Sequence, residues 1–498
     1  MIKIVTADQI KAWDEFTIRE ESIASIDLME RACQAFVTWF VERYDASHKI
    51  GIVCGTGNNG GDGLGVARLL NDWHYPVKVW IVRGSGTESI DFVTNLKRLN
   101  SKISVSEITS SADCELFADR AILIDAIFGS GLSRPVEGIY ANVIDCLNKA
   151  NKIKIAIDIP SGLSIDHPST GAIFKADQTV SFQISKLAFL QPENQHWVGE
   201  IHVVDIGLNK KYLNDVKATH FLVTLKSVKR ILKPRSRFDH KGKFGHALLI
   251  AGSTGKMGAC ILSARATLRS GAGLLTVHVP RNGYSIIQTA VPEAMATTDQ
   301  STDFFSGRDV ESFFTTIGIG PGLGQANETV QGFEYLLKNF NRPMVIDADA
   351  LNILSSNPEL QKLIPEGSVL TPHPGEFVRL VGEWKNDFEK LDKLKELAAR
   401  LQSIIILKGA YTAIATPDRN IYFNSTGNPG MATGGSGDVL SGVLTGLLAQ
   451  EYSSLEASIT GVYVHGLAGD LAVREKGEIS LIAGDIIDYL SAAFKKVH

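Results

Sequence analysis

The chain has 498 residues, of which 44% are hydrophobic and 21% are charged. This length and composition indicate a globular protein with more than one domain. The 50 basic and 54 acidic residues leave a formal net charge of −4, which gives no reason to expect a nucleic acid or an anionic membrane as a partner.

The N-terminus and the cysteines indicate the cellular compartment of the protein. Met1-Ile2-Lys3-Ile4 leads into a polar, helix-like stretch without the apolar core of a signal peptide, and no apolar run is long enough to span a membrane. The five cysteines are scattered, with no C-x-x-C pair: Cys33, Cys54, Cys114, Cys146 and Cys260. We therefore expect neither a disulfide framework nor a structural zinc site, and we expect a cytoplasmic protein.

Short runs rich in β-branched residues recur along the chain, and helical patterns follow them. In the first half they are Ile50–Cys54, Val77–Val82, Ala121–Asp125, Lys154–Asp158 and Thr179–Phe182. In the second half they are Ala247–Ala251, Leu274–Val279, Thr316–Ile319, Met344–Asp347, Ser368–Thr371 and Ile404–Leu407. This alternation predicts an α/β fold with mostly parallel sheets, whose ligands gather at the carboxyl ends of the strands.

A stretch rich in Lys and Arg, from Leu208 to Gly245, separates the two series of strands. It includes Lys233-Pro234-Arg235-Ser236-Arg237, which we interpret as part of a solvated linker rather than an anion site. We place the boundary near residue 220 and predict two different α/β domains, over residues 1–215 and 225–498.

The first motif follows the strand Ile50–Cys54. Gly55-Thr56-Gly57-Asn58-Asn59-Gly60-Gly61-Asp62-Gly63 contains a G-x-G-x-x-G pattern, and we expect a turn here with a helix from about Leu64. Such glycines let backbone N–H groups approach a phosphate. A dehydrogenase would place an acidic residue at the end of the second strand, but Arg83 stands there. A tight turn alone does not need two amides and a carboxylate, which favours a binding site.

Two aspartates end the next strands. Asp125 precedes a glycine-rich loop and Asp158 precedes Pro160-Ser161-Gly162. Either alone is typical of a helix cap, but both would lie at the same sheet edge as the glycine motif. Lys186 follows a further apolar strand and would ordinarily be a surface lysine.

These blocks resemble, in order and spacing, the signature motifs of the NAD(P)H-hydrate epimerase family. The resemblance implies a Rossmann-like three-layer sandwich whose substrate is NADH or NADPH hydrated on the nicotinamide ring. It implies a potassium ion bound by Asn59, Asp125 and Ser161, all of which offer oxygen ligands. The residues implied to line the substrate site are Asn58, Asn59, Gly60, Gly61, Asp62, Gly129, Ser130, Gly131, Leu132, Ser133, Arg134, Pro135, Tyr140 and Asp158.

The reaction inverts the carbon that carries the hydroxyl group. That carbon is next to the ring nitrogen, whose lone pair helps the hydroxyl to leave. An acid–base pair must give a proton to the departing oxygen and take one from the returning water. Our hypothesis assigns this work to Asp158, with Lys186 as its partner.

The second motif, Asn428-Pro429-Gly430-Met431-Ala432-Thr433-Gly434-Gly435-Ser436-Gly437-Asp438, precedes an apolar helix. Glycines at a helix N-terminus leave N–H groups free to bind phosphate. A carboxylate at the rim, Asp438, is placed to accept the proton of a substrate hydroxyl during phosphoryl transfer. The alternative is a glycine-rich loop in which Asp438 only caps the helix.

Further motifs follow other strands of the second half, and together they resemble the hydrate dehydratase branch of the ribokinase-like superfamily. They are His240-Lys241-Gly242, Gly320-Pro321-Gly322-Leu323-Gly324, Asp347-Ala348-Asp349-Ala350-Leu351-Asn352, Thr371-Pro372-His373-Pro374-Gly375-Glu376 and Gly434-Gly435-Ser436-Gly437-Asp438. The resemblance implies a ribokinase-like three-layer sandwich and, with the first half, a bifunctional NAD(P)H-hydrate repair enzyme.

This second resemblance implies that the S hydrate is dehydrated to NAD(P)H at the expense of ADP, giving AMP and phosphate. Magnesium is expected with the nucleotide. The residues implied to contact the hydrate are Ala259, Gly322, His373 and Asp438. Those implied to contact ADP are Lys408, Gly409, Ala410, Tyr411, Thr412, Asn428, Pro429, Gly430, Met431, Ala432, Thr433, Gly434, Gly435, Ser436 and Gly437. Thr254-Gly255-Lys256-Met257-Gly258, before Ala259, departs from the aromatic-Ser-Gly-like segment of the family.

Other functions fit parts of these patterns. An ATP-dependent kinase for a vitamin or a sugar alcohol, fused to a nucleotide-binding Rossmann domain, would use the same phosphate loop. A binding protein without N-terminal activity would not need Asp158 and Lys186. The sequence leaves open ADP against ATP and the NADH against the NADPH hydrate. We expect a homo-oligomer, because exposed helices on such folds commonly pair.

Overall fold

The computed structural model describes residues 1–84, 87–99, 101–110, 113–132 and 134–498. It divides into two compact units. The first comprises Ile4–Ala218 with Asn386–Phe388, and the second comprises Met1–Lys3, Thr219–Lys385 and Glu389–His498. Within the described ranges, we find no helix with the length and apolar character that crossing a bilayer requires.

The first unit is built on a seven-stranded sheet in the order β4-β3-β2-β5-β6-β7-β8. All six pairings are parallel. The strands are β2 (Ile50–Cys54), β3 (Val77–Val82), β4 (Ser104–Ile108), β5 (Ile122–Ala126), β6 (Ile153–Ile157), β7 (Gln178–Phe182) and β8 (Glu200–Val204). The chain starts in the middle of the sheet, runs to one edge and returns to the other, as in a doubly wound Rossmann-like sheet.

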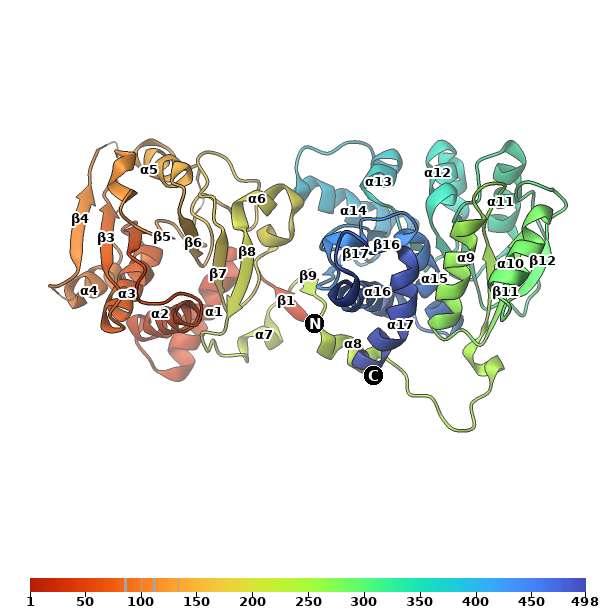
Figure 1. Cartoon of the computed structure of the whole chain (residues 1–498), viewed down its shortest axis with the longest axis horizontal. Helices are drawn as coiled ribbons and strands as arrows, with labels where there is room; N and C mark the ends of the chain where they lie inside the picture. The colour runs from red at the N-terminus through yellow and green to blue at the C-terminus, as the bar shows by residue number, and fades with distance from the viewer. Residues whose placement is uncertain (85–86, 100, 111–112, 133) are drawn as a thin grey trace. The chain divides into compact units, whose positions relative to one another are not determined.

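Helices cover both faces of this sheet because alternate strand residues point to opposite sides. Ile52 and Ile124 pack with α2 (Ser25–Val41) and α3 (Asn58–Asp72), whereas Val53 and Leu123 pack with α5 (Gly138–Lys149). Figure 1 shows α2 and α3 on one side of the strands and α5 on the other. The remaining helices are α1 (Ala7–Glu21), α4 (Ile90–Arg98), α6 (Gln195–Val198) and α7 (Tyr212–Asp215). The predicted three-layer Rossmann-like sandwich is confirmed.

The second unit holds an eleven-stranded sheet in the order β1-β9-β18-β17-β16-β15-β14-β13-β10-β11-β12. Its strands are β1 (Ile2–Ile4), β9 (His220–Leu222), β10 (His246–Ile250), β11 (Leu274–Val279), β12 (Met295–Thr298), β13 (Thr316–Ile319), β14 (Met344–Ile346), β15 (Val369–Leu370), β16 (Ile404–Leu407), β17 (Ala413–Ala415) and β18 (Ile421–Phe423). In the order of the sheet, all pairings between β16 and β12 are parallel. Strand β17 is antiparallel to both of its neighbours, β16 and β18.

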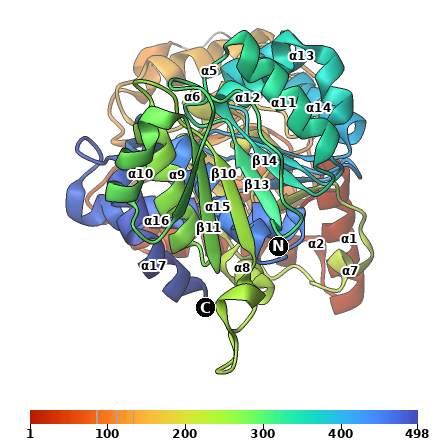
Figure 2. The same ribbon diagram turned by 90° about the vertical axis from the view of Figure 1, so that its right-hand side faces the viewer.

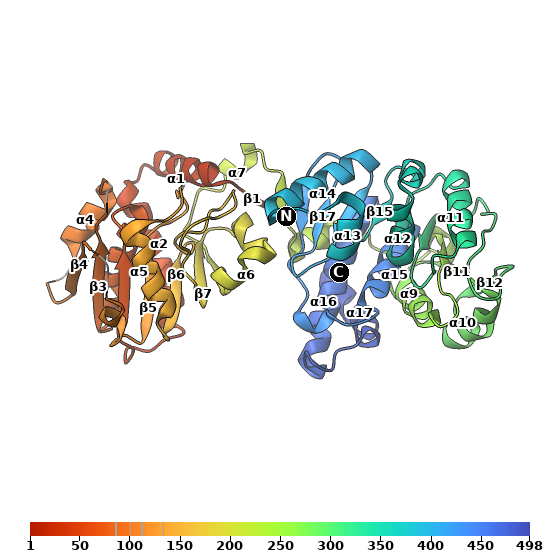
Figure 3. The same cartoon turned by 90° about the horizontal axis from the view of Figure 1, so that it is seen from above.

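Helices again lie on both faces of this second sheet. They are α8 (Leu225–Ile231), α9 (Met257–Arg269), α10 (Tyr284–Ala290), α11 (Asn327–Asn339), α12 (Ala348–Ser356), α13 (Pro374–Val381), α14 (Asp387–Leu401), α15 (Ser436–Ala449), α16 (Ser454–Lys476) and α17 (Ala483–Val497). Figure 2 shows α9, α10, α16 and α17 on one side of the β10, β13 and β14 strands and α11 to α14 on the other, and Figure 3 shows the same separation. This arrangement confirms the predicted three-layer sandwich of the second unit.

The stretch that was interpreted as a linker contains structure, so that interpretation is wrong in part. β9 and α8 lie inside it, and Val223 and Val228 are buried in the core of the second unit. Its basic tail remains largely exposed, although Arg235 donates to Gly271 O at 2.7 Å. The part of the segment from Thr219 onwards therefore belongs to the second unit, and β9 pairs in its sheet.

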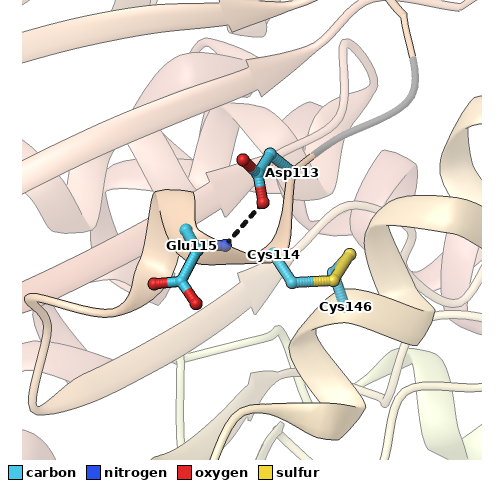
Figure 4. Close-up of a disulfide and its surroundings, with 4 residues drawn as sticks. All are labelled: Asp113, Cys114, Glu115 and Cys146. Atoms are coloured by element: carbon cyan, nitrogen blue, oxygen red, sulfur yellow. Dashed lines mark hydrogen bonds between the residues drawn. A yellow bond between two sulfur atoms is a disulfide. The ribbon is translucent and has the colours of Figure 1, made fainter.

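The expectation that the cysteines form no disulfide is wrong for one pair. Cys114, at the start of a short 3-10 helix, is bonded to Cys146 on α5 (Figure 4). The two lie 32 residues apart in the sequence, and only the packing of the 3-10 helix on α5 brings them together. Cys33, Cys54 and Cys260 are free and buried. Cysteine usage therefore gives no support to the expected reducing compartment.

Two candidate active sites

The glycine-rich motif of the first unit is helical from Asn58 onwards, which corrects the predicted start of the helix at about Leu64. Helix α3 begins at Asn58, directly after the N-cap Gly57. A Cβ atom at Gly60 would overlap the carbonyl oxygen of Gly55, and one at Gly63 would lie 2.6 Å from the Ala126 Cβ. Glycine is therefore required here by the close approach of α3 to β2 and β5, which compensates for its poor helix propensity.

The three residues predicted to bind potassium lie together around the carbonyl oxygen of Phe128. Asn59 Nδ2 donates to Phe128 O at 3.0 Å, and Ser161 Oγ lies 3.2 Å from the same oxygen. Ser161 Oγ also donates to Asp125 Oδ1 at 2.6 Å, and Ser161 N donates to Asp125 Oδ2 at 2.8 Å. The ends of β5 and β6 and the start of α3 thus bring three kinds of oxygen ligand into one cluster.

Asp125 is fully buried. Burial raises its pKa to about 6, and hydrogen bonds from Ser161 and from the Ile127 N–H limit the rise. Among the described residues, no lysine or arginine forms an ion pair with it. A buried carboxylate without a basic partner, surrounded by a carbonyl, a hydroxyl and an amide, fits the donor set of a hard cation.

Asp158 and Lys186 form the second feature of this site. Lys186 Nζ donates to Asp158 Oδ1 at 2.5 Å, to Ser181 Oγ at 2.6 Å and to Phe182 O at 3.1 Å. The lysine side chain is 1% exposed. Sequence reasoning treated it as an ordinary surface lysine, but a buried ion pair of this geometry holds both charges in place.

The backbone of Asp158 lies in the left-handed region, with φ of +65°. A side chain there costs about 1–3 kcal/mol and persists where the surrounding structure fixes it. The fixing contacts are present, since Asp158 N donates to Val180 O and Asp158 Oδ1 accepts from Phe182 N at 3.0 Å. Strain concentrated on one aspartate at a strand end is typical of a functional residue.

The other residues predicted for this site lie in the loop after β5. The loop passes over Asn59, because a Cβ atom at Gly129 would be 3.2 Å from the Asn59 Cβ. The ring of Tyr140 packs on Phe128 at 4.7 Å, and its hydroxyl accepts from Gly84 N at 3.2 Å. Leu132 is half-buried, whereas Gly131, Arg134 and Pro135 are exposed. Ser133 lies outside the described residues.

Arg83, which follows β3, is bound by Glu88 and Glu107 and is therefore not free to bind a phosphate.

The second unit contains an open pocket of about 440 Å³. It is lined by Gly255, Lys256, Gly258, Ala259, Gly322, Ala348, Asp349, Asn352, Glu376 and Asp438. Three of the four residues predicted to contact the hydrate, Ala259, Gly322 and Asp438, are among them. The fourth, His373, caps helix α13, and its Nδ1 accepts from Gly375 N at 3.0 Å. Its ring is half exposed beside the pocket residue Glu376.

A charged cluster lies behind this pocket at the ends of β14, β15 and β16. Lys408 Nζ is 3.0 Å from Asp347 Oδ1 and 3.9 Å from Glu376 Oε2, and Ser441 Oγ donates to Asp347. Burial alone would lower the pKa of Lys408, but the carboxylates of Asp347 and Glu376 reverse that effect and raise it. Lys408 is therefore a permanently charged amine at the floor of the site.

The glycine loop brings the N-terminus of α15 to this lysine. Gly435, with φ of +88°, is the N-cap, and a Cβ atom at Gly437 would lie 3.4 Å from Lys408 Nζ. The positive end of the helix and the ammonium group thus face the same space, as an anion site requires. Burial, reinforced by the charge of Asp347, raises the pKa of Asp438 to about 6. Asp438 is thus a carboxylate at neutral pH that readily accepts a proton.

The two segments predicted for the nucleotide flank this anion site. Asn428 is anchored to α16, because its Nδ2 donates to Asp470 Oδ1 at 3.0 Å. His465 Nε2 is 3.0 Å from Ser436 O and fixes the end of the same loop. In the other segment, Gly409 and Ala410 are exposed, whereas Thr412 Oγ1 closes the turn on Gly409 O at 3.0 Å.

Sequence reasoning missed several residues of these sites. Lys256 was noticed only as a departure from a family pattern, yet its Nζ is 3.1 Å from Asp349 Oδ2 at the pocket rim. Ser181 is one of three acceptors of Lys186, and no motif includes it. Asp14, on α1, lies close enough to Asp158 and Lys186 for their charges to act on it. An ordinary amphipathic helix gives no signal that would have found it.

The fold and the two sites define a class: a two-domain α/β enzyme in which each sheet carries its own lysine–aspartate centre at the carboxyl ends of its strands. Family models agree with this division. A model described as NAD(P)H-hydrate dehydratase matches residues 247–492, and one described as YjeF-related protein N-terminus matches residues 25–188. A bifunctional NAD(P)H-hydrate repair enzyme of Moorella thermoacetica is 36% identical, with 98% of this chain and 96% of the relative covered. The chain belongs to the family of bifunctional NAD(P)H-hydrate repair enzymes, which confirms the predicted membership.

Solved structures resemble the second unit. A crystal structure of an ADP/ATP-dependent NAD(P)H-hydrate dehydratase from Bacillus subtilis, co-crystallized with ATP and Mg²⁺, has a TM-score of 0.50 and 34% identity and covers 55% of this chain and 98% of its own. A ribokinase-like superfamily protein from Enterococcus faecalis has a TM-score of 0.51 and 29% identity and covers 57% and 98%.

Proposed function

We propose that the first unit interconverts the R and S hydrates of NADH and NADPH, and that the second unit dehydrates the S hydrate with ADP, giving AMP and phosphate. The observation that carries this proposal is the presence of a separate centre on each sheet, Asp158–Lys186 in one and Lys408–Asp347 beside Asp438 in the other. A kinase with an accessory binding domain would not need the buried, strained Asp158 of the first unit.

In the first unit, Asp158 takes up the proton of the incoming water while the nitrogen of the nicotinamide ring stabilises the adjacent cationic carbon. Lys186 holds the Asp158 carboxylate in place through its ion pair. Potassium would be held by Asn59, Asp125, Ser161 and the carbonyl of Phe128, and when bound it would supply a positive charge beside the substrate loop. The buried, cation-free carboxylate of Asp125 supports this assignment.

In the second unit, Asp438 accepts the proton of the hydrate hydroxyl as its oxygen bonds to the β-phosphorus of ADP. AMP leaves with the electron pair of the broken phosphorus–oxygen bond. The carbon–oxygen bond of the new phosphate ester then breaks with help from the ring nitrogen, and phosphate departs with that electron pair. The neighbouring carbon loses a proton to water, which forms the ring double bond. The α15 N-terminus and Lys408 are placed to bind the phosphates. No group of three or more acidic, His or Cys side chains in the described ranges is arranged to hold a metal, so we propose that Mg²⁺ binds mainly through the nucleotide phosphates.

Reciprocal variants test this division of labour. Asp158→Asn should lower the rate of R-to-S interconversion at least ~100-fold, because the base is lost, and should leave ADP-dependent dehydration of the S hydrate unchanged. Asp438→Asn should abolish ADP-dependent dehydration of the S hydrate and leave the interconversion of the epimers unchanged. Chromatographic separation of the epimers measures the first activity and NADH formation the second. Loss of both activities in either variant would contradict two independent centres.

Potassium dependence tests the cation site. Replacing K⁺ by a large organic cation should weaken hydrate binding to the first unit, because the loop after β5 rests on Asn59 and Phe128. Dehydration in the second unit is the internal control, measured in the same buffers. Ser161→Ala should remove the potassium response of epimerisation; a variant that keeps the full response would exclude Ser161 from the site.

A further inference from the structure

The epimerase reaction needs a proton donor as well as the base Asp158. The ammonium group of Lys186 has three N–H donors, and Asp158, Ser181 and Phe182 O accept all three. The side chain is 1% exposed. Lys186 therefore has no N–H left to protonate a departing hydroxyl, and it acts as a fixed cation.

Asp158 can accept a proton but is poorly placed to supply one. Its Oδ1 accepts from Lys186 Nζ and from Phe182 N. No described residue donates to its Oδ2. This second oxygen can accept a proton from water, so we look for the acid in another group.

Helix α1 brings such a group to the pair. Ile10 packs against two hydrophobic clusters. One contains Ile159, which follows Asp158 in the sequence, and the other contains Ile184, two residues before Lys186. Trp13 and Thr17 on the same helix are 1% and 0% exposed. Asp14 lies one residue after Trp13 and one turn after Ile10, and therefore on this packed face.

The carboxyl of Asp14 has no structural task. It is half-buried, and no described residue forms a hydrogen bond or ion pair with it. The charges of Asp158 and Lys186 act on this carboxyl, which is therefore near the pair and uncommitted to any other contact.

The charges that act on Asp14 come from three elements. The turn after β6 contributes Asp158, the segment after β7 contributes Lys186, and α1 itself contributes the exposed Glu15. Burial and the charge of Asp158 raise the pKa of Asp14 to about 7, against the opposing effect of Lys186. From α3, Asp62 in turn has its pKa raised by burial, by Asp158 and by Asp14.

Other groups packed on α1 are already engaged. Tyr212, from α7, stacks on Trp13, with 5.9 Å between the ring centroids. Arg31, from α2, pairs with Glu21 at 2.8 Å. Neither neutralises the carboxyl of Asp14.

We propose that Asp14 is the general acid of the epimerase centre, the proton donor to the hydroxyl that leaves the hydrated ring. The inference rests on the proposed epimerase function. The bond between the ring carbon and the hydroxyl oxygen breaks, its electron pair stays on oxygen, and the Asp14 proton converts that oxygen to water. The ring nitrogen lone pair forms a C=N bond to the same carbon. Water then adds from the other face and loses a proton to Asp158, and proton exchange between the two carboxyls restores the starting state.

Asp62 is the competing donor, and the structure favours Asp14. Lys186 opposes the effects of burial and of Asp158 on Asp14, whereas burial and the carboxylates of Asp158, Asp14 and Asp91 all raise the pKa of Asp62. The backbone carbonyl of Asp62 accepts from the Cys33 thiol at 3.4 Å. A carboxyl whose pKa is raised well above the ordinary value of an aspartate by burial is less suited to give up its proton in each cycle.

The test is the pH profile of epimerisation by the full-length chain with K⁺ and without nucleotide, starting from one purified NADH-hydrate epimer. In the wild type, kcat should fall as pH rises through about 7, because Asp14 must be protonated. Asp14→Asn should lower kcat by ~100-fold or more and abolish this decline, with little change in KM. Asp14→Glu should retain the decline, and the exposed Glu15→Gln should match the wild type.

ADP-dependent dehydration of the S hydrate by each variant reports correct folding of the rest of the chain, and circular dichroism reports that of the first unit. An Asp14→Asn variant that is folded and keeps both the wild-type kcat and the decline would overturn the proposal. The proposal would also be overturned if Asp62→Asn, and not Asp14→Asn, abolished the fall of kcat with rising pH. A wild-type chain that does not interconvert the epimers at any pH would instead refute the epimerase function itself.

Discussion

At the scale of single residues, both sites pair a lysine with an aspartate from the end of another strand of the same sheet. Lys186 holds Asp158, and Lys408 holds Asp347. In each case the lysine leaves another carboxyl, Asp14 or Asp438, unpaired beside the pair, and burial raises the pKa of that carboxyl. Removing either lysine would leave a buried carboxylate uncompensated, which is more damaging than the loss of one contact.

The raised pKa of Asp438 predicts the pH dependence of the dehydratase. Its pKa of about 6 lies above the ordinary value of an aspartate, and the base must be ionised to accept the hydroxyl proton. The single-turnover rate on the S hydrate should therefore rise as pH increases through about 6 and level off above it. NADH formation in a stopped-flow experiment measures this rate. A rate that is constant across that range would show that another group accepts the proton.

The sequence motifs indicate candidate residues but not the contacts between them. Asp125 and Ser161 were predicted to share a cation and do share hydrogen bonds. Asp14 and Ser181 could not be predicted, because a polar residue on an amphipathic helix or in a strand has no distinctive pattern. Their roles depend on contacts between segments far apart in the chain.

At the scale of elements, most of the motif predicted as a turn, from Asn58 onwards, is the first part of helix α3. The prediction failed because consecutive glycines and asparagines disfavour helices in isolation, whereas here packing against β2 and β5 overrides that preference. Strand positions were predicted better. Long β-branched runs such as β3 and β11 have the predicted bounds, but strands of three residues such as β9 and β18 carry too little periodicity to be recognised.

Glycine substitutions test this packing. Gly60→Ala should destabilise the first unit by about 1–3 kcal/mol, because the added Cβ would overlap the carbonyl of Gly55. Gly57→Ala is the matched control, since its Cβ would meet nothing within 4 Å. Urea unfolding followed by tryptophan fluorescence compares the two. Equal stability of both variants would show that α3 is not packed as tightly as described.

At the scale of the whole molecule, the motifs predict two different α/β domains. They do not predict which short segments belong to the other unit. Met1–Lys3 belongs to the second unit, and Asn386–Phe388 to the first. A three-residue N-terminal strand is specified by the edge that it pairs with rather than by its own sequence. The disulfide between Cys114 and Cys146 is likewise a product of folding that cysteine spacing did not indicate.

The central claim is that one chain performs both steps of hydrate repair, and the most direct measurement is NADH recovery from a mixture of both NADH-hydrate epimers with K⁺, Mg²⁺ and ADP. We predict complete recovery by the purified wild type, and recovery of only the S fraction by Asp158→Asn. Recovery of only the S fraction by the wild type would contradict the epimerase assignment. No recovery with ADP or with ATP would contradict the dehydratase assignment.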